Sequence, residues 1–269
     1  MTSANVLRGL RGFVFDLDGC VWNGHALNPG ARETLLALHG AGRRLAFISN
    51  NSRATGDELR TRLRGLGVSV AEHVLSPLEI IGRVIADAYG PSRVLVMGAD
   101  ELARAVARGG HEIVAMTRYR EATVVVVGND FDLTYERLTA AARAAAAGAP
   151  LVTPNVDPRL PIEAGDFMPG CGAIVQAVAV AAGRSPIVVG KPAPPLFTIA
   201  LERLGFVAAE VAMVGDSVAS DVRGGHAVGM STVLYAPSGA SDADEADVVV
   251  SSFAELAQRA DVGAPTQKK

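Results

Sequence analysis

The sequence predicts an α/β protein: a Rossmann-like parallel-sheet core with an inserted α/β cap domain. The first reason is that short, apolar, β-branched runs recur along the chain, with helical patterns between many of them. Such alternation is typical of βαβ units whose parallel strands are buried on both faces. The second reason is that several runs end in polar or charged residues, and ligands bind beyond the carboxyl ends of parallel strands.

The expected elements follow from these patterns. The strand candidates are GFVFDL (12–17), RRLAFIS (43–49), RVLVMG (93–98), ATVVVVG (122–128), SPIVVG (185–190), EVAMVG (210–215), STVLY (231–235) and ADVVVS (246–251). The clearest helix candidates are ARETLLALHGAG (31–42), TYERLTAAARAAAAGA (134–149), GCGAIVQAVAVAAG (170–183) and PPLFTIALERLG (194–205).

Composition restricts the class of protein. The chain has 269 residues, of which 49% are apolar and 20% charged, as in ordinary globular proteins. A net charge of −3 gives no reason to expect a nucleic-acid partner. No apolar run approaches the length that a membrane span needs, the N-terminus lacks the pattern of a signal peptide, and two cysteines form no disulfide framework. We therefore expect a cytoplasmic protein with no membrane partner.

The first strand ends in two carboxylates. Asp16 and Asp18 follow the apolar Phe13–Phe15 segment and precede Gly19. If the strand continues, residues two apart share a face, so both charges point the same way. Like charges that are close and buried repel unless a cation or a shared proton lies between them. The pattern therefore predicts a compensating cation at this strand end.

Three further strand ends carry polar groups, and the GKP segment that contains Lys191 is one of them. After the second strand come small hydroxyl and amide side chains with one arginine, an arrangement that suits an anion: Ser49, Asn50, Asn51, Ser52 and Arg53. Asp216 and Asp221 follow the EVAMVG strand, where they could instead be helix caps. Taken together, the carboxylates are suited to Mg²⁺, which prefers oxygen ligands.

Lys191 stands out by composition. Among the 25 basic residues only Lys191, Lys268 and Lys269 are lysines. The last two lie in a C-terminal stretch, 263–269, that we expect to be disordered. A compact ammonium and a planar guanidinium are not interchangeable at a tight anionic site, so Lys191 is a candidate ligand for a phosphoryl group.

These four segments, DLDGCVWNG, ISNNSR, GKP and GDSVASD, resemble the ordered motifs of the haloacid dehalogenase superfamily. The resemblance implies that Asp16 is a nucleophile that forms an aspartyl-phosphate and that Asp18 is the general acid and base. It implies Mg²⁺ held by the Asp16 carboxylate, the Asp18 backbone carbonyl and Asp216. Ser49 and Lys191 would hold the transferring phosphoryl group. Asp221 would position Lys191 or a metal-bound water.

The position of a long insertion in the chain indicates which branch of the superfamily the sequence resembles. The stretch from Asp16 to Ser49 has room for one helix and one strand, whereas that from Ser49 to Lys191 is long enough for a domain. We therefore expect core segments at 1–79 and 186–262 and a cap at 80–185. This arrangement resembles the type IIA branch of the superfamily, which implies a phosphatase. An apolar cap sheet could also support a homodimer.

The segment Thr153–Ile174 resembles the substrate loop of that branch. Its NVDPRLPIE part is similar to the phosphoglycolate and glycerol-3-phosphate phosphatases, which implies a small phosphorylated metabolite as substrate and 4-nitrophenyl phosphate as an artificial one. Within Asn155–Glu163 we expect substrate contacts from Asn155, Asp157 and Arg159, although Arg159 could equally be a surface residue. Trp22 either packs in the core or lines the substrate pocket, and we expect packing.

Other functions fit less well. A dehalogenase of this superfamily would lack the second carboxylate of the first motif, and Asp18 is present. A phosphomutase or other phosphotransferase would usually carry a helical cap between Asp16 and Ser49, where there is little room. A non-catalytic phosphometabolite-binding protein would not need Asp16 and Lys191 together. Mg²⁺-dependent release of nitrophenol from an aryl phosphate separates the phosphatase from the last alternative.

Overall fold

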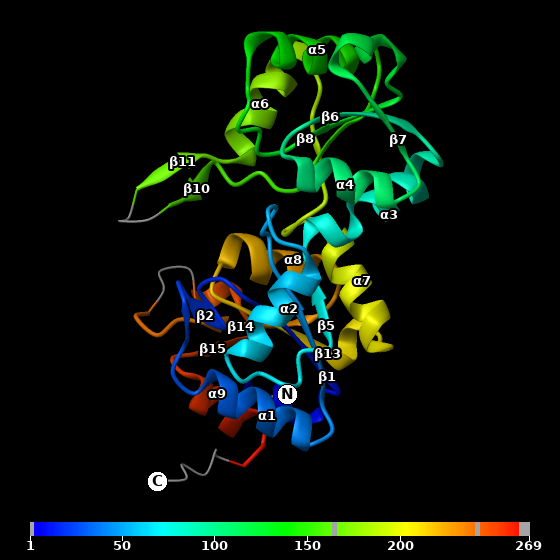
Figure 1. Cartoon of the computed structure of the whole chain (residues 1–269). Coiled ribbons are helices and arrows are strands. Elements are labelled where there is room, and N and C mark those ends of the chain that lie inside the picture. Colours follow the sequence, from blue (N-terminus) through cyan, green and yellow to red (C-terminus); the bar gives the residue numbers. More distant parts are fainter. Residues whose placement is uncertain (1–2, 163–165, 240–242, 264–269) are drawn as a thin grey trace. The chain divides into compact units, whose positions relative to one another are not determined.

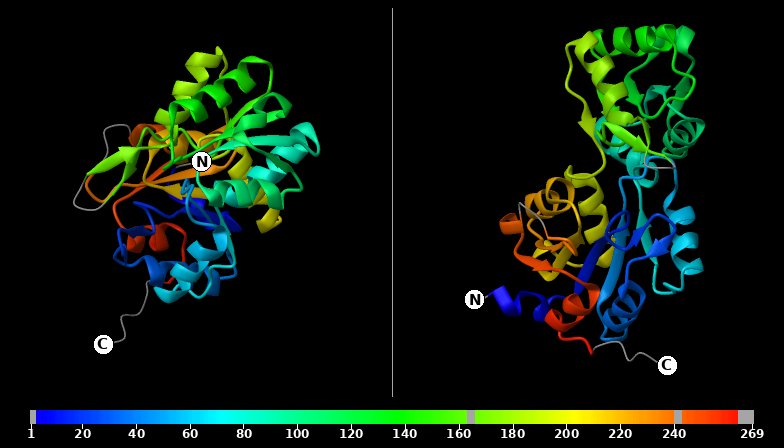
Figure 2. Two further views of the ribbon diagram at one scale, coloured as in Figure 1. Left: turned by 45° about the horizontal axis from the view of Figure 1, so that its top comes forward. Right: turned by 90° about the vertical axis from the view of Figure 1, so that its left-hand side faces the viewer.

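The computed structural model describes residues 3–162, 166–239 and 243–263. The described chain divides into two compact units. The core unit comprises residues up to Ser49, Gly56–Leu75 and the chain from Lys191 onward. The inserted unit comprises Asn50–Thr55 and Ser76–Gly190. Both ends of the chain belong to the core unit (Figure 2), so the inserted unit interrupts a fold that is completed by later sequence.

The core unit is built on a six-stranded parallel sheet, with strand order β15-β14-β13-β1-β4-β5. Its central strands are buried along their whole length because aliphatic and aromatic side chains occupy both faces. The strands are β1 (Gly12–Asp16), β4 (Arg44–Ile48), β5 (His73–Leu75), β13 (Val211–Gly215), β14 (Ser231–Tyr235) and β15 (Val248–Val250).

Helices cover this sheet in packed pairs. α1 (Ala31–Gly40) lies beside α9 (Phe253–Arg259), and α7 (Pro194–Leu204) packs on α8 (Arg223–Ala227) (Figure 1). Helix α2 (Gly56–Gly65) contacts the edge strand β5. The shorter elements are η1 (Ser3–Gly9), the β2–β3 ribbon (Trp22–Asn23 and Ala26–Leu27), η4 (Ala208–Glu210), η5 (Val218–Val222) and η6 (Ala243–Glu245).

The inserted unit repeats the same architecture on a smaller scale. Its five-stranded parallel sheet has the order β12-β9-β8-β6-β7. The strands are β6 (Arg93–Met97), β7 (Glu112–Val114), β8 (Val124–Val127), β9 (Leu151–Thr153) and β12 (Ile187–Val188). The α/β class, the parallel sheets and all eight strand candidates are confirmed.

One of these strands lies in a different sheet from the one expected. The SPIVVG segment was expected to begin the second core segment at 186, but Ile187 and Val188 pair with Val152 and Thr153 in the inserted sheet. The reason is that β9 has an open edge there, and the ladder continues as the Val189 N–H donates to the Thr153 carbonyl (3.0 Å). The inserted unit thus extends beyond both expected boundaries, 80 and 185.

Two helix pairs sandwich the inserted sheet. α3 (Pro77–Tyr89) packs on α4 (Asp100–Arg108), and α5 (Tyr135–Ala146) packs on α6 (Cys171–Ala182) (Figure 1). The alanine-rich face of α5 buries small side chains against Val175 and Val178 of α6. Helix α3 approaches α4 closely, since a Cβ at Gly82 would lie 2.8 Å from the Gly109 Cα. The turn η2 (Met116–Glu121) completes the unit.

The expected substrate loop contains a hairpin. Strands β10 (Arg159–Pro161) and β11 (Phe167–Pro169) pair antiparallel, with Leu160 opposite Met168. Glu163, the last residue of the expected Asn155–Glu163 loop, lies outside the described residues, as do residues 264–269 of the stretch 263–269 that we expect to be disordered. In the described part of the chain, no helix has the length and apolar character to cross a membrane.

Candidate active site

The site begins where β1 ends. Phe13, Val14 and Phe15 are completely buried, and the ring of Phe15 stacks on Phe47 with 5.9 Å between centroids. This rigid strand carries the Asp16 side chain into an environment where it is only 4% exposed. A carboxylate cannot be buried there without a compensating partner.

Lys191 is that partner. Its Nζ donates to Asp16 Oδ1 and, over 2.7 Å, to Asp221 Oδ1. All three side chains are almost inaccessible to solvent. Burial alone would lower the pKa of Lys191, but the charges of Asp16 and Asp221 outweigh it and raise that pKa. Lys191 therefore stays charged, and a charged ammonium is what a ligand for a phosphoryl group needs.

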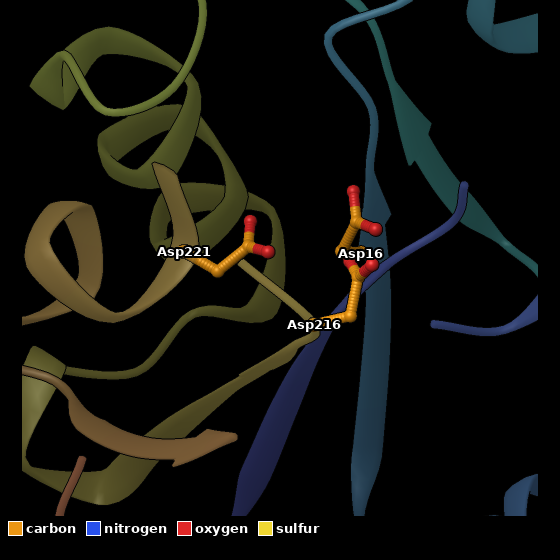
Figure 3. Close-up of side chains that lie close together, drawn as sticks. All are labelled: Asp16, Asp216 and Asp221. Atoms are coloured by element: carbon orange, nitrogen blue, oxygen red, sulfur yellow. The ribbon is translucent and has the colours of Figure 1, made fainter. Parts of the chain in front are cut away.

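Asp216 joins the same cluster from the end of β13. Carboxylate oxygens of Asp16, Asp216 and Asp221 all lie within 4.8 Å of one another (Figure 3). Gly19 makes this approach feasible: it has φ +92°, and a Cβ there would collide with the Asp216 carboxylate. Only glycine meets both conditions without strain. The residue is exposed overall, but partial desolvation of its carboxyl group, reinforced by the charge of Asp221, raises the pKa of Asp216.

The cluster fits a divalent cation. Three carboxylates face one lysine, and burial raises the pKa of Asp16 well above its ordinary value although Lys191 opposes that shift. Asp16 Oδ2 is buried and, among the described residues, has no hydrogen-bond donor. An oxygen without a donor, beside a second carboxylate, is a suitable ligand for Mg²⁺. Asp16, Asp216 and Asp221 are therefore the residues that could hold the metal.

The strand-alternation argument does not extend to Asp18, because strand β1 ends at Asp16. The strand stops at Asp16, and Asp18 lies in the following turn, where it bridges to Trp22. Its carboxylate is exposed and accepts hydrogen bonds from Trp22 Nε1 (2.8 Å) and Ser49 Oγ (2.9 Å). The hydrogen-bond partners of Asp18 thus differ from that of Asp16, whose carboxylate accepts from Lys191.

The segment after Ser49 behaves differently from the expected anion cradle. Asn50–Thr55 belongs to the inserted unit by its contacts. Asn51 Oδ1 accepts the backbone N–H groups of residues 53 and 54, Ser52 Oγ lies 3.4 Å from Cys171 Sγ, and the Arg53 guanidinium lies over the Phe131 ring. Of the predicted phosphoryl ligands, the core unit thus brings Ser49 near Asp18, and Lys191 near Asp16.

The predicted substrate contacts lie in the inserted unit. Arg159, at the start of β10, is exposed and stacks over Phe167, with the guanidinium carbon 4.3 Å from the ring centroid. Asp157 is exposed as well. Asn155 is buried, and its side chain is hydrogen-bonded within the unit.

Sequence reasoning missed two hydrogen-bonding roles that shape the motif, those of Trp22 and Asn28. Trp22 is fully buried, which confirms the expected packing, but its hydrogen bond to Asp18 was not foreseen. Asn28 Nδ2 donates to the carbonyls of Gly19 (2.9 Å) and Cys20 (2.5 Å) and so holds the turn that carries Asp18. The hydrogen bond of Trp22 could have been anticipated, because the residue was expected to be buried and a buried indole N–H needs an acceptor. No pattern in the sequence indicated Asn28.

Comparison with known proteins agrees with this geometry. A family model described as haloacid dehalogenase-like hydrolase matches residues 13–112, and a second HAD-hydrolase-like model matches residues 188–256. Mouse chronophin is 36% identical to the chain over 92% of its length and 88% of the relative's. The chain belongs to the haloacid dehalogenase-like hydrolase family.

Two further proteins narrow its place in that family. A D-glycerol 3-phosphate phosphatase from Mycobacterium tuberculosis is 37% identical over 82% of this chain and 61% of its own. The crystal structure of a 4-nitrophenylphosphatase from Thermotoga maritima has a TM-score of 0.84 at 29% identity and covers 95% of this chain and 99% of its own. This haloacid dehalogenase-like hydrolase is a phosphatase.

Proposed function

We propose that this phosphatase is a Mg²⁺-dependent phosphomonoesterase that acts through an aspartyl-phosphate on Asp16. The observation that carries the proposal is the asymmetric environment of the Asp16 carboxylate. One oxygen is fixed by Lys191, whereas the other is buried and receives no hydrogen bond from any residue that the structure describes. A carboxylate held in this way is oriented for attack and is a ready ligand for a cation.

The residues have distinct parts in the reaction. An Asp16 oxygen attacks phosphorus, and the bond from phosphorus to the ester oxygen breaks as Asp18 protonates the departing alcohol. Asp18 then removes a proton from water, the water oxygen attacks phosphorus, and the Asp16–phosphorus bond breaks to release inorganic phosphate. Ser49 and Lys191 hold the phosphoryl oxygens during both steps. Trp22 and Ser49 orient the Asp18 carboxylate.

Mg²⁺ would be held by the carboxylates of Asp16 and Asp216 and the backbone carbonyl of Asp18. When bound, it neutralises charge on the carboxylates and on the phosphoryl group. Asp221 would serve Lys191 first, because its Oδ1 accepts the Nζ proton while its Oδ2 accepts the Ser217 N–H (3.1 Å). That double hold fixes where the ammonium points.

The proposed substrate is a small phosphometabolite in the cytoplasm: glycerol 3-phosphate, phosphoglycolate or a similar sugar or polyol phosphate. The similarity to a D-glycerol 3-phosphate phosphatase supports this class, and that to a 4-nitrophenylphosphatase supports an artificial aryl substrate. The inserted unit would act as the cap that selects among substrates, using Asn51, Ser52, Arg53, Asp157 and Arg159. A homodimer is part of this proposal and is tested by light scattering.

One experiment tests the proposed function directly. The purified chain is incubated with Mg²⁺ and a panel of about a hundred phosphate esters, and inorganic phosphate is measured. We expect release from polyol phosphates and 4-nitrophenyl phosphate that stops when the metal is chelated. Release that continues undiminished with excess chelator would contradict the metal-dependent mechanism.

A further inference from the structure

The end of strand β9 binds two segments of the inserted unit that are far apart in sequence. The Pro154 carbonyl accepts the N–H of Gly190 over 2.8 Å. The Asn155 side-chain Nδ2 donates to the Asn50 carbonyl over 2.7 Å. A single dipeptide, Pro154–Asn155, therefore fixes both Asn50 and Gly190.

These two segments adjoin the proposed phosphoryl ligands. Asn50 directly follows Ser49, and Gly190 directly precedes Lys191. They also pack against each other, because a Cβ at Gly190 would lie 2.5 Å from Asn50 Oδ1 and 2.6 Å from the Pro154 carbonyl oxygen. The backbone at residue 190 thus has no space for a side chain, although its conformation is not one that demands glycine.

The Asn155 side chain is held at both ends. Its Nδ2 donates to the Asn50 carbonyl, and its Oδ1 accepts the N–H of Asp157 over 3.2 Å. In addition, the backbone carbonyl of Asn155 accepts the Thr153 hydroxyl over 2.8 Å. The residue is only 4% exposed. A buried amide with its donor and acceptor both committed to the backbone is suited to fixing loops rather than to contacting a substrate.

We propose that Asn155 and Gly190 are positioning residues for the phosphoryl site. They fix the chain that follows Ser49 and the chain that precedes Lys191, and thereby set where these two ligands stand. The inference rests on the proposed function and deepens it. It replaces the expected substrate contact at Asn155 with an indirect role, and it assigns a role to the glycine of the GKP motif through close packing against Asn50.

The test compares four forms of the full-length chain. Asn155→Asp keeps the shape but sets a carboxylate oxygen against the Asn50 carbonyl, which removes the donor and adds repulsion. Gly190→Ala adds the Cβ that has no space. Ser92→Ala is the matched control, because it removes a partly buried hydrogen bond of a buried residue of the inserted unit, from Ser92 Oγ to the Gly90 carbonyl, which involves neither Asn50 nor Gly190.

Each form is assayed below its thermal unfolding midpoint with 4-nitrophenyl phosphate, with inorganic phosphate as competitive inhibitor and with varied Mg²⁺. For Asn155→Asp and Gly190→Ala we expect kcat/KM to fall and the inhibition constant of phosphate to rise, each about tenfold or more, since small displacements of positioned groups are costly. The apparent Mg²⁺ affinity should stay within about twofold, as the proposed carboxylate ligands lie in the core unit. Ser92→Ala should match wild type in kcat/KM, in the inhibition constant of phosphate and in the apparent Mg²⁺ affinity.

The outcomes separate the two proposals. An inactive wild-type protein would overturn the proposed function itself. An active wild type with unchanged phosphate inhibition in both variants would overturn the positioning role alone. Equal losses in phosphate and Mg²⁺ affinity would indicate general damage and would also overturn it. If Asn155→Asp does not fold, Gly190→Ala decides the result.

Discussion

The core unit and the inserted unit share one architecture but differ in what their strands present at the carboxyl ends. In the core, buried carboxylates of Asp16 and Asp221 converge on one lysine. In the inserted unit, the buried side chains beyond β8 and β9 include two neutral amides, Asn129 and Asn155. Parallel strands gather polar groups at one edge in both units, but among the described residues the carboxylate cluster lies in the core unit, where the excess negative charge requires a cation.

The one buried carboxylate after β8 shows the contrast most directly. Asp130 is paired with Arg137 (2.7 Å), whose side chain is 28% exposed and so reaches water. Lys191 has no such route to solvent, at 3% exposure. An ion pair that reaches solvent contributes modestly to the free energy of unfolding. An enclosed cluster of charges loses much more stability when any one of its members is removed.

The largest expected effect on activity comes from replacing one buried aspartate by asparagine in each unit. Asp16→Asn should abolish Mg²⁺-dependent release of nitrophenol while the protein stays folded, because an amide is neither nucleophilic nor a good Mg²⁺ ligand. Asp130→Asn should keep kcat close to wild type. Residual activity of Asp16→Asn above a few per cent of wild type would rule out the covalent mechanism.

Removing the cation of each cluster should give the next largest difference. Lys191→Met leaves two buried carboxylates without their partner and should cost about 3–5 kcal/mol of unfolding free energy as well as most of the activity. Arg137→Met should cost less than Lys191→Met, since it leaves one carboxylate rather than two without a cation and the guanidinium that it removes is partly solvated. Urea unfolding with chelator present measures both. Similar losses in the two variants would show that the distinction between the clusters is unfounded.

Asp18→Asn tests the solvent-reaching carboxylate of the core. As the proposed general acid, it should matter most for poor leaving groups, so glycerol 3-phosphate hydrolysis should fall by about 10²-fold or more. Hydrolysis of 4-nitrophenyl phosphate should fall less, because nitrophenolate leaves without a proton. Equal losses on both substrates would exclude Asp18 as the acid.

The smallest effect is expected for a charge in the inserted unit. Arg159→Ala should raise KM for glycerol 3-phosphate or phosphoglycolate by about tenfold, the value of a charge-assisted hydrogen bond, and should hardly alter that for 4-nitrophenyl phosphate. Arg118→Ala, which breaks an exposed pair with Glu121, is the matched control within this unit. A similar rise in KM on both substrates would mean that Arg159 supports the hairpin through Phe167 instead.

The amino-acid sequence by itself determined the class of the fold and the members of the core cluster. Apolar β-branched runs predicted all eight strands named from them, because burial on both faces leaves a continuous apolar pattern. Carboxylates at the ends of β1 and β13 were expected to meet, because parallel strands carry their carboxyl ends to one edge, and the structure brings Asp16 and Asp216 together. The rarity of lysine indicated Lys191, which joins them.

The tertiary structure decided two kinds of feature. One depends on the residue at which a strand ends, and the other depends on which sheet a strand joins. Strand β1 ends at Asp16 and Asp18 lies in the turn that follows, so side-chain alternation, which holds only while a strand continues, does not place Asp18. Strand β12 pairs with the edge strand β9 and so belongs to the inserted sheet. Pairing at a sheet edge depends on the backbone N–H and C=O groups that are available there, and the apolar pattern of the added strand does not reveal it. The hydrogen bonds of Asn28 and Asn155 join residues through space, and nothing in their local sequence specifies them.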